Sequence, residues 1–337
     1  MKKFKILFMI AGLLFFAFLI YEVGPASILK NIQQVGWRFV IIFALWFFCY
    51  VFQNVAWALE MRKSFAEVGF LSLLKARIAG EAMNGLIPLG NFGGEPVKAY
   101  ILSNKTSRTE IVASLILDKT VFAFGSLLYI FAGLVVAVFA IAELSYEMKF
   151  LVFALLGLMV WGLIWFVRKR TFFTRLCMKL EAWGIATKFF AQKMDHIRAM
   201  DERIASFYRS DKIRFVASIL FHFLGKMLNA VEFYLVFHYL GLELSFAYAL
   251  SIHALSVIIN TIFIFVPGHW GVAEGGQAFI FLALGLNPAD GIAVGVVRRI
   301  RHIFWTLIGL AIFAFSDPRK KKEVIEEIKT EEEGVNE

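Results

Sequence analysis

Two short stretches of the chain combine a proline, several glycines and a glutamate between apolar segments. Residues 88–95 read Pro-Leu-Gly-Asn-Phe-Gly-Gly-Glu, and residues 267–274 read Pro-Gly-His-Trp-Gly-Val-Ala-Glu. The number of intervening residues between the Pro and the Glu is the same in both copies. Pro and Gly interrupt helices, so both stretches predict a helical hairpin. The residues expected to form the turns are Pro88, Gly93, Gly94, Pro267, Gly268 and Gly271.

The shift along the chain that carries Pro88 onto Pro267 also carries Glu95 onto Glu274 and Lys119 onto Arg298. One hypothesis is that freed glycine amides, together with Lys119 and Arg298, bind an anion while the two carboxylates contact a cationic group or orient the basic side chains. The alternative is that the carboxylates only cap the interrupted helices by accepting hydrogen bonds from backbone amides. The residues alone leave both open.

Further charged residues lie in apolar segments, where an ionised side chain costs about 2.5–3.5 kcal/mol at the centre of a membrane helix. They form three stripes at helical spacing, which contain Arg77 and Glu81, then Lys226 and Glu232, then Arg298 and Arg301. Either these groups pair with one another, for example Glu81 with Arg77 or Lys226 with Glu232, or they line a polar route. The predicted substrate-binding residues are Glu95, Lys98, Lys119, Lys226, Glu232, Glu274 and Arg298.

The composition places these charges in a membrane protein. The chain is 60% hydrophobic and 16% aromatic, and its mean hydropathy is +0.72. A soluble core cannot bury that much apolar surface. Two cysteines, Cys49 and Cys177, indicate neither a disulfide framework nor a metal site. We therefore predict no metal, no cofactor and, although the net charge is +9, no nucleic-acid partner, because the basic residues flank apolar runs.

The apolar runs predict an all-α, polytopic integral protein of the cell membrane with both termini in the cytoplasm. Membrane spans are expected at residues 6–21, 39–58, 121–142, 150–167, 214–240 and 302–316, with interrupted segments at 66–120 and 246–297. The predicted organisation is an N-terminal signal anchor and loop (1–38), a first repeat unit (39–142), a connecting helix and cytoplasmic amphipathic segment (143–213), a second repeat unit (214–318) and a charged cytoplasmic tail (319–337).

The two units are predicted to have opposite orientations in the membrane. The distribution of Lys and Arg directs the first span of unit one inward and the first span of unit two outward. Inverted-topology repeats of this kind place interrupted helices from both halves near the middle of the bilayer, where transporters build their substrate sites. A transporter is therefore the favoured class, with paired re-entrant or interrupted helices.

Two other functions stay open. No nucleophile elbow, phosphate loop or His-Glu-x-x-His motif is found, so no catalytic residue is predicted and an enzyme is disfavoured. A membrane-embedded transferase acting on a polyprenyl-linked sugar, or an accessory protein of glycolipid or hopanoid synthesis, remains the first alternative. The second is a carrier of a small solute or ion that uses the stripe from His222 to Glu232.

The motifs resemble those of the flippase-like membrane region of lysylphosphatidylglycerol synthases and their stand-alone relatives. The likeness rests on the segment from Asn84 to Lys98, on Asp118-Lys119, and on the segment from Val266 to Glu274 with Arg298, and it extends to about residue 318. At positions 98 and 119, where this chain has Lys, the family usually has Arg. The resemblance implies a stand-alone member without the aminoacyltransferase domain.

The resemblance also implies a function, the movement of a polar lipid between the leaflets of the membrane. The substrate would be an anionic or aminoacylated phospholipid, or an isoprenoid-linked lipid. A homo-oligomer is left open, and the resemblance does not identify the headgroup, the direction of transport or the partner synthase.

Overall fold

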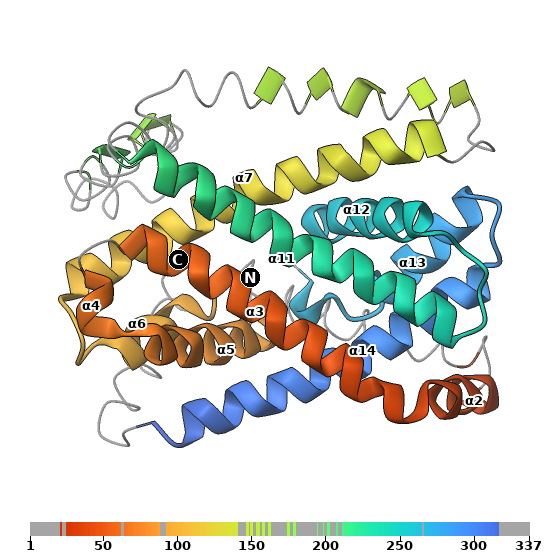
Figure 1. Ribbon diagram of the computed structural model, residues 1–337, viewed down its shortest axis with the longest axis horizontal. Coiled ribbons are helices and arrows are strands. Elements are labelled where there is room, and N and C mark those ends of the chain that lie inside the picture. Colours follow the sequence, from red (N-terminus) through yellow and green to blue (C-terminus); the bar gives the residue numbers. More distant parts are fainter. Residues whose placement is uncertain are drawn as a thin grey trace.

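The computed structural model of the chain describes residue 21, residues 25–61, 64–87, 92–140, 211–264 and 266–316, and scattered positions between 146 and 207 (Figure 1). All the regular structure in these parts is helical, which confirms the prediction of an all-α protein. The predicted spans at 6–21 and 150–167, the segment 168–213 and the tail 319–337 fall wholly or largely outside the described residues.

The first half contains a short entry helix followed by two long helices with a helical hairpin between them. The entry is α2 (Pro25–Val35) with the 3-10 turn η1 (Gly36–Arg38), and it leads into α3 (Phe39–Met61). The remaining elements are α4 (Phe65–Val68), α5 (Phe70–Leu86), α6 (Glu95–Leu102) and α7 (Arg108–Ala140).

The second half repeats this order of elements. It consists of α11 (Lys212–Tyr239), α12 (Phe246–Ile262), the 3-10 turn η3 (Pro267–His269), α13 (Val272–Ala283) and α14 (Pro288–Ala314). The shift that relates Pro88 to Pro267 also carries α3 onto α11, α5 onto α12, α6 onto α13 and α7 onto α14, with ends that differ by a few positions. The order of helices therefore follows the spacing of the two glycine-rich motifs.

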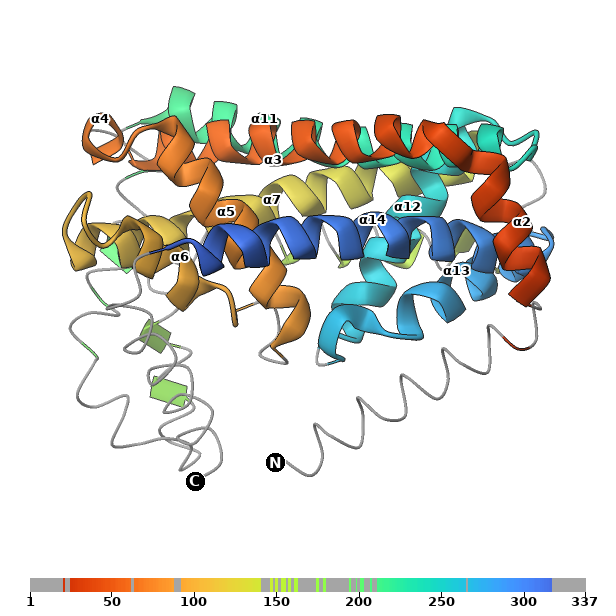
Figure 2. The same ribbon diagram turned by 90° about the horizontal axis from the view of Figure 1, so that it is seen from below.

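The paired helices run in opposite directions. In Figure 1, α3 and α11 lie side by side and antiparallel, and α7 and α14 also run in opposite senses on either side of them. The α5–α6 hairpin enters the bundle from one end and the α12–α13 hairpin from the other, so that the tips of both lie in the middle of its length (Figure 2). This arrangement is compatible with an inverted-topology repeat, which itself stays a prediction.

Three helices in the described parts are long and apolar enough to cross a membrane, namely Ile32–Met61, Arg108–Phe139 and Lys212–Tyr239. They match the spans predicted at 39–58, 121–142 and 214–240 except at their ends. The second was predicted to start at 121, after the charged pair Asp118-Lys119, but α7 already begins at Arg108. Likewise α14 begins at Pro288, not near 302. Each helix continues through its charged residues because neighbouring helices supply partners for them.

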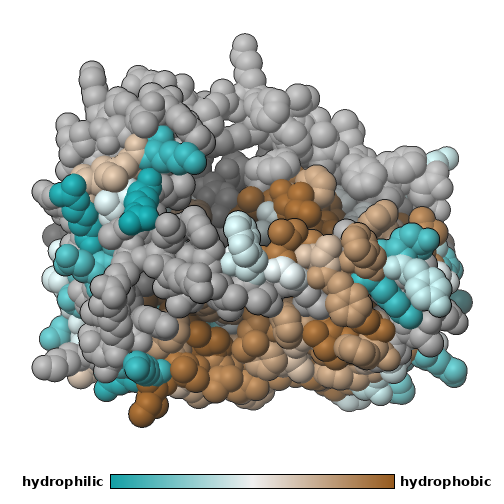
Figure 3. Space-filling model, turned by 90° about the horizontal axis from the view of Figure 1, so that it is seen from above, coloured by the Kyte–Doolittle hydropathy of each residue, from teal (hydrophilic) through white to brown (hydrophobic). Residues whose placement is uncertain are grey.

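A large core joins the second half to α7. Phe233, Val236 and Phe237 of α11 pack with Leu134 of α7 and Val297 of α14, and all five are buried. The outside of the bundle is apolar as well, with exposed side chains such as Leu220, Leu282 and Leu307. On the face shown in Figure 3, hydrophobic residues occupy the middle and hydrophilic residues gather at the two ends. That distribution suits a bundle surrounded by lipid.

Candidate functional site

The first hairpin is held closed by a close approach of backbones. Gly94, at the N-terminus of α6, lies against the carbonyl group of Gly80 in α5, and a Cβ at position 94 would collide with that carbonyl oxygen. The amide of Gly94 also donates a hydrogen bond of 2.7 Å to Oδ1 of Asn84. Gly94 is therefore required by packing in the tertiary structure, whereas Pro88 lies outside the described residues.

Four charged side chains form a network on this hairpin. The ammonium of Lys98, which is buried, donates to Oε1 of Glu81 at 2.9 Å and to Oε1 of Glu95 at 3.0 Å. Lys119 of α7 contacts the same Glu95 oxygen at 3.1 Å, and 23% of its side chain is exposed. Two lysines and two glutamates balance in charge. Glu95, Lys98 and Lys119 were predicted at a common site, and the structure brings them together.

The second hairpin has a comparable arrangement built on Glu274. Its Oε2 accepts a hydrogen bond of 3.1 Å from the amide of Gly271, at the start of α13, which is the capping arrangement that the sequence left as one alternative. Its Oε1 accepts one of 2.7 Å from Nε of Arg299. Arg299 also donates from Nη1 to the carbonyl of Gly268 at 2.7 Å and from Nη2 to that of His269 at 3.1 Å. One arginine thus binds both the carboxylate and the turn.

The partner of Glu274 is Arg299 and not Arg298, the residue whose position is equivalent to that of Lys119 in the first half. Consecutive residues of a helix point about 100° apart, so only one of these two arginines can face α13. Arg298 instead lies with its guanidinium 4.2 Å from the ring centre of Phe233 and with Nε 3.7 Å from Oε1 of Glu232. The spacing in the sequence located the basic partner of Glu274 on the correct turn of α14. It selected Arg298, however, which faces a different side of the helix from Arg299.

The tips of the two hairpins touch. A Cβ added to Gly268, which has φ of +57°, would lie 2.9 Å from the carbonyl oxygen of Gly85 near the end of α5. A Cβ on Gly85 would in turn lie 2.8 Å from Cε1 of His302 in α14. Segments far apart in sequence therefore meet at glycines, where the absence of a side chain permits contact between backbones.

A group with excess positive charge includes Arg298 and Arg301, which lie on the same stretch of α14 as Arg299 and His302, the residues that reach the two hairpin tips. Glu232 of α11 accepts a hydrogen bond from Nη1 of Arg301, and Arg298 approaches its other oxygen. Two arginines therefore share one carboxylate. Lys226 lies earlier on α11 with its ammonium 4.6 Å from the ring centre of Phe122, and among the described residues no carboxylate lies within ion-pair distance of it. The pairing of Lys226 with Glu232 that the sequence allowed is not formed.

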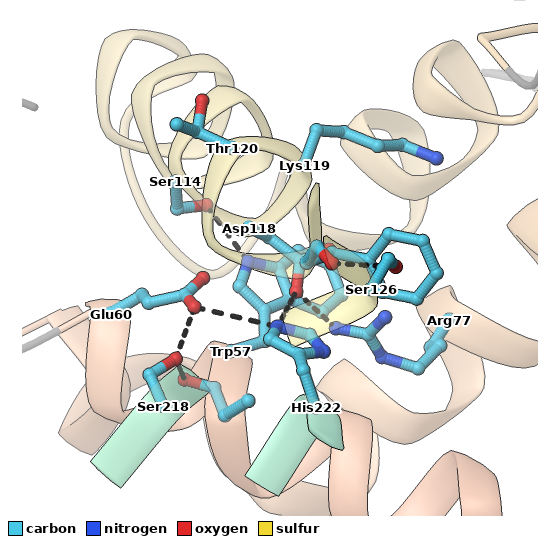
Figure 4. Close-up of polar contacts among 12 residues, drawn as sticks. Trp57, Glu60, Arg77, Ser114, Asp118, Lys119, Thr120, Ser126, Ser218 and His222 are labelled. Carbon is cyan, nitrogen blue, oxygen red and sulfur yellow. Dashed lines mark hydrogen bonds and ion pairs between the residues drawn. The ribbon is translucent and has the colours of Figure 1, made fainter. Parts of the chain in front are cut away.

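A separate buried cluster joins α3, α5, α7 and α11. Arg77 donates to Oδ1 of Asp118 at 2.6 Å, so it does not pair with Glu81 as the helical spacing had suggested. Nε2 of His222 is 3.6 Å from both Oδ1 of Asp118 and Oε1 of Glu60 (Figure 4). Glu60 was not predicted from the sequence, because it stands alone at the end of an apolar span. Arg299 was not predicted either.

The predicted site residues thus fall into distinct groups. Glu95 and Lys98 lie on the first hairpin, where Lys119 of α7 contacts Glu95, and Glu274 lies on the second. Glu232 and Arg298 form a third group with Arg301, and Lys226 lies earlier on α11. The first two groups are balanced in charge and brace the hairpins. Within these described groups, Arg298, Arg301 and Lys226 are opposed by Glu232 alone, so they are candidates for binding an anionic group.

Comparison with known proteins places the chain among membrane proteins. A family model described as "Lysylphosphatidylglycerol synthase TM region" matches residues 4–309. A UPF0104 membrane protein of Methanothermobacter thermautotrophicus is 22% identical over 93% of this chain and 95% of its own length. A UPF0104 membrane protein of Pyrococcus horikoshii is 24% identical over 92% of this chain and 96% of its own length. No solved structure matches the chain.

Proposed function

Because the chain belongs to the family of lysylphosphatidylglycerol synthase TM regions, we propose that it is a lipid flippase. It moves a polar lipid with a phosphate-containing headgroup between the leaflets of the cell membrane while the acyl chains remain in the bilayer. The family describes a membrane region, and the proposal extends this to the transport of a lipid. Aminoacylated and isoprenoid-linked lipids are included in the substrate class.

The observation that carries the proposal is the contact between the two hairpin tips, together with a group of excess positive charge on the same stretch of α14 that reaches those tips. Gly85 and Gly268 bring the interrupted helices together in the middle of the bundle. Non-helical backbone is tolerated at membrane depth where protein or a wet cavity satisfies its polar groups, and transporters place their substrate sites at such interruptions. Opposite orientation of the two units, which we propose as an inverted-topology repeat, would let the contact open to either side.

In this mechanism the roles of the charged residues differ. Arg298 and Lys226 bind the phosphate, because neither is neutralised by a carboxylate of its own. Glu232 contacts a cationic headgroup when one is present. Glu95, Lys98 and Lys119 hold the first hairpin and Glu274 holds the second. Lys119 is partly exposed, so it can meet the lipid as the hairpin moves.

The test is a flipping assay in proteoliposomes with fluorescent phosphatidylglycerol and its lysyl form. Wild type is compared with Arg298→Ala and Lys226→Ala, and the matched control is Arg214→Ala, which removes an exposed arginine at the start of α11. We expect both site variants to flip anionic lipid at least about tenfold more slowly, which corresponds to an activation free energy that is higher by roughly 1.4 kcal/mol. The control should behave as wild type.

Two results would overturn parts of the proposal. Equal flipping rates for wild type and both site variants would contradict the assignment of Arg298 and Lys226 to the phosphate site. No flipping by wild type, combined with formation of a new glycolipid from a labelled polyprenyl-phosphate sugar, would replace the flippase by a membrane-embedded transferase.

A further inference from the structure

A second polar centre lies away from the hairpin contact, where α3, α7 and α11 meet. Glu60, Asp118 and His222 come from these three helices, and their oxygen and nitrogen ligand atoms all lie within 4.8 Å of one another. Figure 4 shows the imidazole of His222 between the two carboxylates. All three side chains are buried, and the proposed flippase mechanism uses none of them.

The groups at this centre do not satisfy one another. Nε2 of His222 is 3.6 Å from each carboxylate, which is too long for a hydrogen bond, and neither ring nitrogen has a hydrogen-bond partner among the described residues. Within the same described part of the chain, Oε2 of Glu60 also has none. Buried polar atoms are normally paired, so the unpaired Nε2 of His222, which lies 3.6 Å from a carboxylate oxygen on each side, indicates a missing binding partner.

Charge identifies that partner. Arg77 of α5 neutralises Asp118, and Ser218 donates a hydrogen bond to Glu60 without changing its charge. With His222 neutral, one negative charge remains. Lys119 extends away from the cluster and contacts Glu95, and Lys226 contacts the ring of Phe122. A divalent ion would overcompensate this single charge beside Arg77, whereas one proton balances it and needs no additional space.

We propose that Glu60, Asp118 and His222 form a binding site for one exchangeable proton, and that this proton is coupled to lipid movement. The coupling half of the proposal rests on the proposed flippase function. Protonated carboxylate and histidine groups inside transporters commonly serve as proton relays. No bond other than that to the proton is made or broken, and the proton arrives from one side of the membrane and leaves to the other.

Consecutive residues of α7 connect this centre to the first hairpin. Asp118 binds Arg77 on α5, and Lys119 binds Glu95 on α6. A proton bound at this centre reduces the total negative charge that attracts Arg77, and it therefore weakens the attraction between the centre and α5. The proton gradient would thereby bias the position of the hairpin.

The proton site is tested directly by infrared pH titration of the full chain in lipid nanodiscs, without any transport. We expect wild type to show the carbonyl stretching band of a protonated, buried carboxyl group that disappears as the pH rises. Glu60→Gln should remove this band and His222→Asn should displace its midpoint. Glu243→Gln, which alters a glutamate in the loop after α11, is the control and should leave the band unchanged.

A milder substitution keeps the test valid if Glu60→Gln or His222→Asn fails to fold. Ser218→Ala removes only the hydroxyl that donates to Glu60 and should shift the midpoint of the same band upward in pH, because the ionised carboxylate loses a donor. Identical titrations of wild type, Glu60→Gln and Ser218→Ala would overturn the proton site. Zinc that copurifies in equimolar amount and is lost in His222→Asn would overturn it as well.

The coupling is tested in proteoliposomes with an imposed pH gradient. We expect the gradient to accelerate wild-type flipping in one direction, and Glu60→Gln to flip at a rate that no longer responds to it. If wild type flips lipid equally with and without the gradient, the coupling is wrong although the site stands. If wild type flips no lipid while the infrared titration is intact, the proposed function fails and the proton site remains.

Discussion

Arg299 of α14 donates a hydrogen bond from Nε to Oε1 of Glu274 at 2.7 Å, and the same guanidinium holds the carbonyls of Gly268 and His269. The centre of the Trp270 ring lies 4.5 Å from Cζ of Arg299, so the ring covers the guanidinium. This arginine therefore ties the helix start, the turn and α14 together. Its neighbour Arg298 lies beside Glu232 and does not contact Glu274, so it can take the phosphate-binding role that we propose for it.

The first prediction concerns the different contributions of Arg299 and Arg298 to stability. Arg299→Ala should lower the free energy of unfolding by about 3–5 kcal/mol, because it leaves Glu274 as a buried, unpaired carboxylate. Arg298→Ala should lower it less, since Arg301 continues to neutralise Glu232. Thermal unfolding of the detergent-solubilised chain measures both. The double variant Glu274→Ala with Arg299→Ala should lose less stability than the two single losses added together, and strict additivity would contradict the pairing.

The second prediction concerns the close approach of α5 and α6. Gly94→Ala places a methyl group against the carbonyl of Gly80, so the hairpin must open and the melting temperature should fall by several degrees, as for a loss of about 1–3 kcal/mol. Gly225→Ala in α11 is the matched control, because its Cβ would meet other atoms only at 3.5 Å or more. Equal melting temperatures for both variants would show that Gly94 is not constrained in this way.

The third prediction addresses the orientation of the two units. Lys105, in the connection between α6 and α7, and Ala289, just after the connection between α13 and α14, are both exposed. In a background with Cys49 and Cys177 replaced by Ser, Lys105→Cys should react with a membrane-impermeant maleimide from the cytoplasmic side only. Ala289→Cys should react from the outer side only. Reaction of both from one side would exclude an inverted-topology repeat.

The fourth prediction concerns the choice of headgroup and depends on the proposed function. Glu232→Gln removes the carboxylate shared by Arg298 and Arg301, so the positive charge of this group rises by one. The ratio of the flipping rate of phosphatidylglycerol to that of its lysyl form should increase, because an anion is attracted and a cationic headgroup repelled. The ratio is measured on protein that retains a wild-type elution profile, and an unchanged ratio would place Glu232 away from the headgroup.

Much of the architecture was predictable from local patterns. Apolar runs indicated α3, α7 and α11, because a helix in lipid must present apolar side chains on most of its surface. The constant shift between the two glycine-rich motifs predicted the order of the elements in the second half. Helix ends were less predictable at Asp118-Lys119 and before Arg298, since hydropathy treats a charged pair as a boundary even where a neighbouring helix neutralises it.

Local features of the chain were enough to identify a helical membrane protein with two glycine-interrupted hairpins, because composition and helix-breaking residues act over short distances in sequence. They also selected Glu95, Lys98 and Lys119, which do meet. The packed bundle was needed to show that Arg299 binds Glu274, that Arg77 binds Asp118, and that Glu60 and His222 share a centre. These partners come from helices far apart in sequence. Packing sets the rotation of each helix about its axis, and this rotation determines which of two adjacent charged residues faces a given neighbouring helix.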